Sequence, residues 1–370
     1  MHVLMCNWRD TRNPEGGGSE RYVEAMARGL VARGHQVTIA CAEHEQAPRD
    51  EIVDGVRFVR RGSKLGVYLQ VLLRLLFRRY GAVDLVVDVQ NGLPFFTRMV
   101  TRRPVVLLVH HVHREQWPVV YPGLIGKVGW WIESRLSPVL YRHSQYVTVS
   151  TASRDELVAL GVDRERIAIV HNGSDPAPYI PAGRSTTPRL VVVGRLVPHK
   201  QVEHAIDALR ELLPQHPELH LDLVGDGWWH DDLVGYAAER AVSDHVTFHG
   251  FVSEEVKHEV LAASWVMALP SLKEGWGIVI GEAGAHSTPT VAYRSAGGPR
   301  ESIEDGVSGV LVDSPAEFTA ALRRLIEDDD ERKRLGAGAL AMSHQFSWDN
   351  AMGHFATLIE VCGLVVPEHA

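Results

Sequence analysis

The chain has 370 residues, enough for two domains of ordinary size, and its 45% hydrophobic and 23% charged residues are typical of a soluble globular protein. No apolar run is long enough to span a bilayer, and Cys6, Cys41 and Cys362 lie too far apart in sequence for a metal motif or a disulfide framework. Residues 1–185 carry 24 Lys and Arg against 18 Asp and Glu, a net +6, whereas the remainder carries 14 against 28, a net −14.

This composition favours a reducing compartment, and Met1 leads directly into an apolar strand without the pattern of a signal peptide. We therefore expect a cytoplasmic protein that does not bind nucleic acid. The basic N-terminal half suggests an anionic membrane surface as an alternative partner, which would place the protein at the inner face of the membrane.

The N-terminal residues predict a strand, a glycine loop, a helix and a second strand. The strand His2–Cys6 precedes the loop 7–18, a helix follows from about Ser19, the expected N-cap, to Arg33, and Gln36–Ala40 is the next strand. The three consecutive glycines 16–18 lack the spacing of the dinucleotide fingerprint. A glycine-flanked helix N-terminus still suits an anion or a sugar hydroxyl.

The next segments predict a hairpin over Ile52–Arg60, with Asp54-Gly55 as its turn, and a basic amphipathic helix over Gly66–Arg79. That helix either packs on the core as an ordinary surface helix or attaches to an anionic membrane. Trp117, Trp130 and Trp131 give the second interpretation some support.

Short apolar runs predict strands over Asp84–Asp88 and Val105–His110, and the second ends in a cluster of three histidines, His110, His111 and His113. Because no further ligand is identifiable, we do not expect a metal site there. Strands at Tyr146–Val149 and Ile167–Val170, with a helix between them, complete a first domain over 1–180, and residues 176–188 have the composition of a linker.

A second domain over 188–346 begins with the strand Leu190–Val193, and Arg195 and Lys200 lie in the turn after it. Two cations in one turn suit a diphosphate, although a pair of solvated surface cations would have the same pattern. The remaining predicted strands are Leu219–Val224, Val246–Phe248, Trp265–Leu269, Thr290–Ala292 and Gly309–Val312, and helices close the chain from about Ala316, Glu331 and Trp348.

The most informative stretch, Ser271–Ala285, contains Glu274 and Glu282 with seven residues between them, in and after a strand-to-helix turn. The glycines of this turn and the positive end of the predicted helix suit a phosphate, whereas carboxylates accept hydrogen bonds from hydroxyls. A sugar nucleotide would satisfy both. Taken alone, such a stretch is more often a surface helix with two solvated glutamates and glycines for packing.

Strands that alternate with helices predict an α/β protein of two Rossmann-like domains, each with a parallel sheet. Ligands of such sheets bind outside the carboxyl ends of the strands. The glycine loop, His110, Arg195 and the Glu274 turn all follow predicted strands.

Four motifs in this order carry a resemblance to a known family: Gly16–Arg21, Val191–Lys200, the Glu274–Glu282 pair and Gly297–Glu301. Together they resemble the retaining glycosyltransferases of family 4, among the glycosyl transferases group 1, over nearly the whole chain. The resemblance implies the GT-B fold, in which two Rossmann-like domains face a central cleft and a C-terminal helix, here 347–370, crosses back onto the first domain.

The resemblance also implies roles for individual residues. The expected catalytic residues are His110, Glu274, Arg195 and Lys200, with His111 as the alternative to His110. The expected donor-binding residues are Gly17, Gly18, Arg195, Lys200, Gly225, Phe251, Val252, Glu274, Gly275, Gly277, Ile278, Val279 and Glu282. Glu274 is expected to bind sugar hydroxyls, and a role as a glycosidase-type nucleophile is a weaker alternative. No metal or other cofactor is expected.

The expected activity is that of a retaining, metal-independent hexosyltransferase, which moves a sugar from a UDP- or GDP-linked donor to an acceptor hydroxyl of a lipid, glycan or natural product. Two other functions stay open at this point: a sugar-nucleotide epimerase of similar fold, and a non-catalytic sugar-nucleotide-binding protein.

Overall fold

The computed structural model describes residues 1–180 and 183–364, which form two compact units, each around its own sheet. Unit 1 combines Met1–Asn172 with the segment that begins at Trp348, and unit 2 is Gly173–Ser347. Parts of the predicted linker (181–182) and of the predicted C-terminal segment (365–370) lie outside the described residues.

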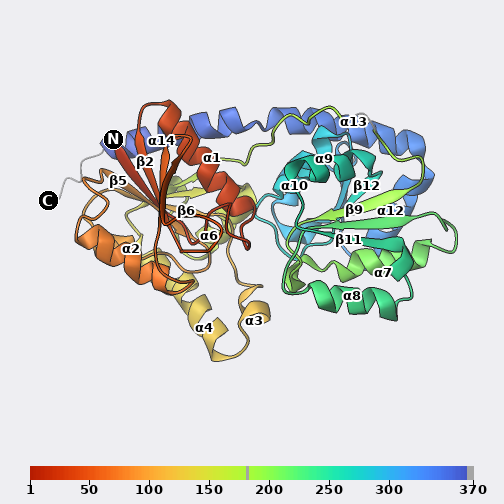
Figure 1. Ribbon diagram of the computed structural model, residues 1–370, viewed down its shortest axis with the longest axis horizontal. Coiled ribbons are helices and arrows are strands. Elements are labelled where there is room, and N and C mark those ends of the chain that lie inside the picture. The colour runs from red at the N-terminus through yellow and green to blue at the C-terminus, as the bar shows by residue number, and fades with distance from the viewer. Residues whose placement is uncertain (181–182, 365–370) are drawn as a thin grey trace. The chain divides into compact units, whose positions relative to one another are not determined.

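Unit 1 contains an eight-stranded sheet of order β3-β4-β2-β1-β5-β6-β7-β8 (Figure 1). Only the β3–β4 hairpin is antiparallel among its strand pairs, and its turn at Asp54-Gly55 is as predicted. The strands are β1 His2–Cys6, β2 Gln36–Cys41, β3 Asp50–Val53, β4 Val56–Arg60, β5 Leu85–Gln90, β6 Val105–Val109, β7 Gln145–Thr148 and β8 Ile167–Ile169.

The helices of unit 1 cover this sheet and supply the outer part of its core. They are α1 Gly18–Ala32, α2 Gly66–Leu76, α3 Trp117–Val120, α4 Leu124–Trp131, α5 Ser137–Leu140, α6 Thr151–Ala159 and α14 Trp348–Leu364. Helix α2 ends at Leu76 rather than at the predicted Arg79, because Arg78 adopts a left-handed conformation with φ of 54° that cannot continue a right-handed helix. Figure 1 shows α14 alongside α1, which it contacts.

Unit 2 contains an entirely parallel six-stranded sheet of order β11-β10-β9-β12-β13-β14. The strands are β9 Arg189–Val193, β10 His220–Val224, β11 Val246–Gly250, β12 Val266–Leu269, β13 Thr290–Tyr293 and β14 Gly309–Val312. The helices are α7 Glu203–Leu212, α8 His230–Glu239, α9 Glu254–Ala263, α10 Ile278–Ala285, α11 Pro299–Ser302, α12 Pro315–Glu327 and α13 Asp329–Gln345.

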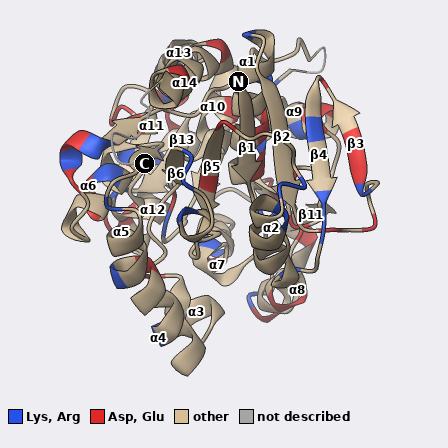
Figure 2. Ribbon diagram, turned by 90° about the vertical axis from the view of Figure 1, so that its left-hand side faces the viewer, with Lys and Arg blue, Asp and Glu red and all other residues tan. Residues whose placement is uncertain are grey.

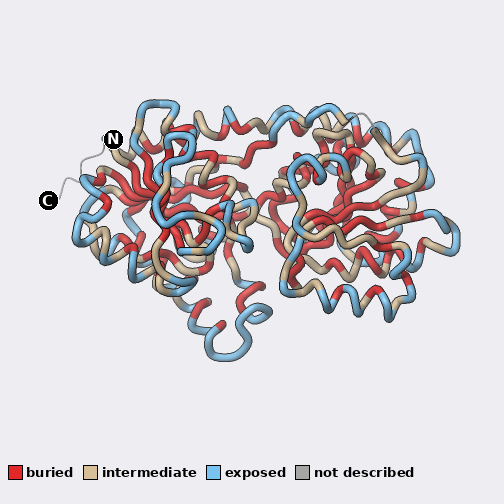
Figure 3. Tube along the Cα trace, viewed as in Figure 1, coloured by how far each residue is buried: buried red, intermediate tan, exposed pale blue. Residues whose placement is uncertain are grey.

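Strand β9 shows why both faces of this sheet are covered. Leu190 and Val192 belong to one buried cluster, and Val191 and Val193 belong to another, as expected when successive side chains point to opposite faces. A parallel sheet buried on both faces has continuous apolar strands, and β9, β12, β13 and β14 are almost entirely buried, as Figure 3 shows, whereas the edge strand β11 is mostly half-buried. The predicted α/β class with parallel sheets is confirmed.

The chain passes from unit 1 to unit 2 after Asn172 and returns at Trp348, and within each unit the residues beside these two points lie close together. In unit 2 the Ser174 backbone N–H donates to the Phe346 carbonyl at 2.8 Å. In unit 1 the Tyr22 hydroxyl donates to the Val170 carbonyl at 3.1 Å, and the Tyr22 ring meets that of Trp348 with centroids 6.3 Å apart. Unit 2 is therefore an insertion whose two ends lie close together. Within residues 1–180 and 183–364, no helix combines the length and hydropathy needed to cross a bilayer.

Helix α14 packs on α1 through a glycine, which gives a testable contact. A Cβ added at Gly29 would lie 2.6 Å from the Met352 Cβ, so Gly29→Ala should overpack the helix pair and lower the free energy of unfolding by about 1–3 kcal/mol. The matched control is Gly235→Ala in α8, where no atom lies within 4 Å and alanine should stabilise by about 0.5–1 kcal/mol. Urea unfolding midpoints that move in the same direction for both variants would contradict the packing.

Candidate active site

Three strands of unit 2 end in glycines whose backbones touch. Gly194, Gly225 and Gly250 follow or end β9, β10 and β11, and all three have positive φ. A Cβ at Gly225 would lie 2.0 Å from the Gly194 carbonyl oxygen, and the Gly225 N–H donates to the Gly250 carbonyl at 2.9 Å. The loops at this end of the sheet therefore pack backbone against backbone, which leaves no room for a side chain at Gly225.

A partly buried ion pair joins the loops after β9 and β12. Lys200 Nζ donates to Glu274 Oε1 at 2.6 Å, and the Leu272 N–H donates to the His199 carbonyl at 2.9 Å. Burial by itself would raise the pKa of the Glu274 carboxyl, but the charge and hydrogen bond of Lys200 hold that pKa below its usual value. Glu274 is therefore a carboxylate at neutral pH.

The backbone of Glu274 is fixed by the glycine segment after β13. The Glu274 N–H donates to the Ala296 carbonyl at 2.8 Å, and the Gly298 N–H donates to the Glu274 carbonyl at 3.0 Å. A Cβ at Gly298 would lie 2.3 Å from the Gly275 carbonyl oxygen, so only glycine allows this close approach. The predicted motif Gly297–Glu301 thus holds the Glu274 loop in place.

Helix α10 begins directly after this loop. Gly277 is its N-cap with φ of 86°, and Ile278 and Val279 are its first helical residues. The first N–H groups of a helix lack intrahelical partners and carry a partial positive charge, which favours an anion. Arg195, Lys200, Glu274, Gly275 and this helix N-terminus all follow the carboxyl ends of β9 and β12.

Glu282 lies further along α10 and is almost fully buried. Its Oε1 accepts from Lys257 Nζ of α9 at 3.0 Å, and Lys257 also bonds both oxygens of Glu254. A buried carboxylate needs such a partner, and Lys257, 25 residues away in sequence, was not predicted from any motif. At the turn after β11, Phe251 is 79% exposed, whereas Val252 packs against the core.

In unit 1 the glycine loop leads into α1 through one half of a capping box, the bond from the N-cap N–H to the Glu20 side chain. The N-cap is Gly17, with Gly18 the first helical residue, and the predicted N-cap Ser19 is wrong. Glu20 Oε2 accepts from the Gly17 N–H at 2.7 Å, and Glu20 Oε1 lies 3.4 Å from Arg9. The start of α1 is therefore bonded by Glu20 and not by Ser19, because the Glu20 side chain reaches back to the Gly17 N–H. Glu20 is completely buried.

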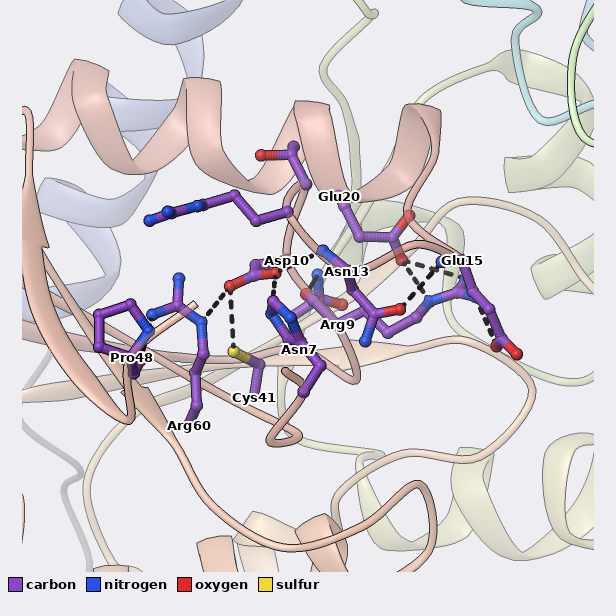
Figure 4. Close-up of polar contacts among 12 residues, drawn as sticks. Asn7, Arg9, Asp10, Asn13, Glu15, Glu20, Cys41, Pro48 and Arg60 are labelled. Atoms are coloured by element: carbon purple, nitrogen blue, oxygen red, sulfur yellow. Dashed lines mark hydrogen bonds and ion pairs between the residues drawn. The ribbon is translucent and has the colours of Figure 1, made fainter. Parts of the chain in front are cut away.

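The loop before Gly17 is anchored by a second buried carboxylate, as Figure 4 shows. Asp10 Oδ2 accepts from Arg60 Nε at 2.5 Å, and Asp10 Oδ1 accepts from the Asn13 N–H at 3.0 Å. The Gly16 N–H donates to the Asn13 carbonyl at 2.7 Å. The position of the glycine loop therefore depends on charges from β4 and α1, which fix it from both sides.

The predicted strand Val105–His110 is β6, which ends at Val109, so His110 lies directly after the strand. His110 is buried with its ring edge-on to Tyr22, and its Nε2 has no hydrogen-bond partner in the described part of the chain. Burial lowers the pKa of His110 to about 4, against the opposing charge of Glu20, so the imidazole is neutral at pH 7. The rings of His111 and His113 stack with centroids 4.3 Å apart.

The structure thus places the predicted residues in two groups. Unit 2 holds Arg195, Lys200, Glu274 and the α10 N-terminus on neighbouring loops. Unit 1 holds Gly17, Gly18 and His110 close to Glu20, whose charge acts on His110. Glu20 was not predicted, although its position three residues after Gly17 has the spacing of a capping box. Among residues 1–180 and 183–364, no group of three or more His, Cys, Asp or Glu side chains is placed to hold a metal ion.

Two family models match the chain: Glycosyltransferase Family 4 over residues 16–178 and Glycosyl transferases group 1 over residues 181–342. A D-inositol 3-phosphate glycosyltransferase of Nocardioides sp. is 35% identical over 51% of this chain and 47% of its own length. The enzyme of the same name from Acidothermus cellulolyticus is 28% identical over 91% of this chain and 84% of its own. In several such matches the chain spans about half the length of the curated relative.

Solved structures share the fold. Sucrose-phosphate synthase from Thermosynechococcus elongatus has a TM-score of 0.81 at 18% identity, covering 97% of this chain and 98% of its own. HepE from Anabaena, solved with UDP-glucose, has a TM-score of 0.77 at 20% identity and covers 98% of this chain and 100% of its own. The architecture is GT-B. With both of its halves matched by these models, the chain belongs to the glycosyl transferases group 1, with an N-terminal part of Glycosyltransferase Family 4.

Proposed function

We propose that this glycosyltransferase uses a nucleoside diphosphate sugar as donor, with UDP or GDP as the nucleotide, and transfers the sugar to an acceptor hydroxyl with retention at the anomeric carbon. The observation that carries the proposal is the Lys200–Glu274 pair beside the N-terminus of α10. One small region offers a cation, a carboxylate and a helix N-terminus, which suit a diphosphate and sugar hydroxyls together.

On this proposal the donor lies along the loops of unit 2. Arg195, Lys200 and the N–H groups of Ile278 and Val279 stabilise the diphosphate, whose negative charge grows as the sugar leaves. Glu274 accepts hydrogen bonds from the sugar hydroxyls, and Lys200 keeps it ionised for that role. Because two cations oppose the diphosphate charge, no metal ion is required.

The other predicted residues keep separate roles. Glu282 binds the ribose hydroxyls, and backbone groups at Phe251 and Val252 contact the base beside Gly225. His110, neutral and with an unpartnered Nε2, offers a hydrogen bond to a sugar hydroxyl. Gly17 and Gly18 supply backbone close to the donor phosphates.

In the transfer step the bond between the anomeric carbon and the phosphate oxygen breaks, and the acceptor oxygen bonds to that carbon on the same face. The proton of the acceptor hydroxyl passes to the departing phosphate. The relatives named D-inositol 3-phosphate glycosyltransferase support a small polar acceptor. The protein would act in the cytoplasm, where nucleotide sugars are made.

Calorimetry with UDP, GDP, dTDP, ADP and NAD in the presence of EDTA tests the donor site. We expect tight binding of one nucleoside diphosphate, and Arg195→Ala should weaken that binding about tenfold to a hundredfold because one charge-assisted contact is lost. Arg323→Ala, whose guanidinium pairs with Glu211 on the surface, is the control and should bind normally. Binding of NAD alone, or a need for a divalent cation, would contradict the proposal.

Glu274→Gln tests the sugar contact. It should lower turnover by about a hundredfold or more, while the affinity for the free nucleotide changes little, because the carboxylate meets the sugar rather than the base or phosphate. Product formation followed by NMR reports both the rate and the anomeric configuration. Normal turnover in the variant would remove Glu274 from the sugar site, an inverted product would exclude retention, and an isomerised donor formed without acceptor would indicate an epimerase.

Lys200→Met tests the ion pair through stability. In the native protein Glu274 has a lowered pKa, so its stabilising contribution is present above its unfolded pKa and is lost as the pH falls through the lowered value. Without Lys200, the low exposure of Glu274 raises its pKa, and the unpaired carboxylate destabilises the variant by about 1–3 kcal/mol at pH 7. This deficit should shrink as the pH falls toward 4.

The matched control is Lys333→Met, which removes a lysine that is 73% exposed and pairs with Asp329. It should cost less than about 1 kcal/mol with little pH trend. Denaturant unfolding of the three proteins at pH 7, 5.5 and 4.5 provides the comparison. A deficit for Lys200→Met that stays constant with pH would mean that Glu274 is not the group responsible.

A further inference from the structure

Unit 1 carries a short helical hairpin, α3 and α4, whose base is buried and whose tip is apolar and exposed. Figure 1 shows both helices projecting from the sheet of unit 1. The exposed fractions are 76% for Leu124, 69% for Ile125, 47% for Val128 and 56% for Trp131. Their spacing of i, i+1, i+4 and i+7 places them along one face of α4, so this helix directs an apolar face outward.

The hairpin base is fixed by buried contacts. Trp117 Nε1 donates to the buried Glu133 at 2.6 Å, and His113 bonds the same carboxylate through its backbone and its ring. Added Cβ atoms at Gly92 and Gly129 would lie 2.9 Å and 2.3 Å from the Trp117 ring, so the ring is held between two glycines. The exposed tip is therefore presented by a rigid base.

Helix α2 likewise has one buried side and an exposed apolar face. Val67 and Val71 bury one face, while Leu65, Leu69 and Leu73 form an exposed stripe that continues into Leu76 and Phe77. The helix therefore packs on the core through one apolar face and exposes another. Figure 3 shows the outer parts of α2 and of the hairpin as exposed.

Cations outnumber acids around these apolar residues, although the buried Arg60 pairs with Asp10 and Lys64 pairs with Glu15. Residues 55–83 contain seven Lys and Arg and no Asp or Glu. Around the hairpin the exposed cations are Arg114, Lys127, Arg135 and Arg142, against the single exposed acid Glu115, since Glu133 is buried. Figure 2 shows α3 and α4 with few charged positions and none in red at the tip. Apolar side chains rimmed by cations complement an anionic bilayer, whose headgroups attract the cations while the acyl region receives the apolar tip.

We propose that the α3–α4 tip and the outer stripe of α2 dock unit 1 onto an anionic phospholipid bilayer. Helix α4 has eight residues, about 12 Å of helix, so it can enter the headgroup region but cannot cross the hydrocarbon core. Lys127 and Arg135 extend to the phosphates while Leu124 and Ile125 enter below them. Docking requires neither donor nor turnover, so it is independent of the proposed transfer.

Vesicle flotation of the full chain tests the proposal without any substrate. We expect binding to vesicles that contain phosphatidylglycerol, weaker binding to pure phosphatidylcholine, and loss of binding as salt is raised. The double variant Leu124→Ser/Ile125→Ser should lower the affinity for vesicles about tenfold or more, because it removes the two aliphatic side chains that would be buried in the bilayer. Arg78→Gln/Arg79→Gln should lower binding to anionic vesicles by about tenfold and leave binding to neutral ones unchanged.

The matched control is Val361→Ser/Leu364→Ser in α14, where two apolar residues of 56% and 79% exposure lie outside the proposed face. It should bind like the native chain. Trp131 gives a second readout: the fluorescence change that brominated lipid causes in the native chain should be reduced in Trp131→Phe, which keeps the apolar surface.

Three results would overturn the proposal: no binding to anionic vesicles, equal loss in the tip and α14 variants, or a Trp131 signal unaffected by brominated lipid. Sedimentation velocity addresses a second copy of the chain as the occupant of this face. A dimer that the tip variant dissociates, without vesicle binding by the native chain, would assign the surface to self-association instead. Each of these outcomes is independent of whether the nucleotide site binds its proposed donor.

Discussion

The parallel arrangement of the strands is the constraint on which the rest of this structure depends. Every strand of unit 2 enters its sheet from the same end, so every loop at the other end starts at a carboxyl terminus. The loops after β9 and β12, neighbours in the sheet but about 80 residues apart in sequence, must therefore meet. Their meeting brings a lysine and a glutamate into one partly buried pair, and close backbone contacts at glycines hold the loops that carry them.

Carboxylates with little exposure recur among the residues of the two units' candidate sites, and each has a different partner. Glu274 relies on Lys200, Glu282 on Lys257, and Glu20 on Arg9 and a backbone N–H. A buried charge without such a partner would take up a proton or destabilise the fold. The same groups that make the loops fit for polar ligands thus also decide whether the loops keep their shape.

Much of the fold followed from the sequence because local patterns sufficed. The apolar runs that became β1, β9 and β14, and the Asp54-Gly55 turn, are short-range signals. The partners of the site residues depend on long-range contacts instead. No motif links Lys257 to Glu282. The side chain that bonds the start of α1 is that of Glu20 and not the expected Ser19. Which face of α4 points outward depends on the packing of its other face, at Gly129, against the Trp117 ring. Periodicity predicts that a helix has an apolar face, but only the fold decides whether that face is covered.

The insertion of unit 2 into unit 1 has a consequence for how such a chain can change. The chain leaves unit 1 after Asn172 and returns at Trp348, and Tyr22 touches both neighbourhoods, while Ser174 and Phe346 are bonded within unit 2. A segment whose ends lie side by side can be replaced whole by another of different length without stretching the host sheet. Recombination at these two short connections could therefore exchange the glycine and glutamate loops of unit 2 as a block. The apolar hairpin of unit 1, and β6 with the His110 that follows it, would be inherited unchanged.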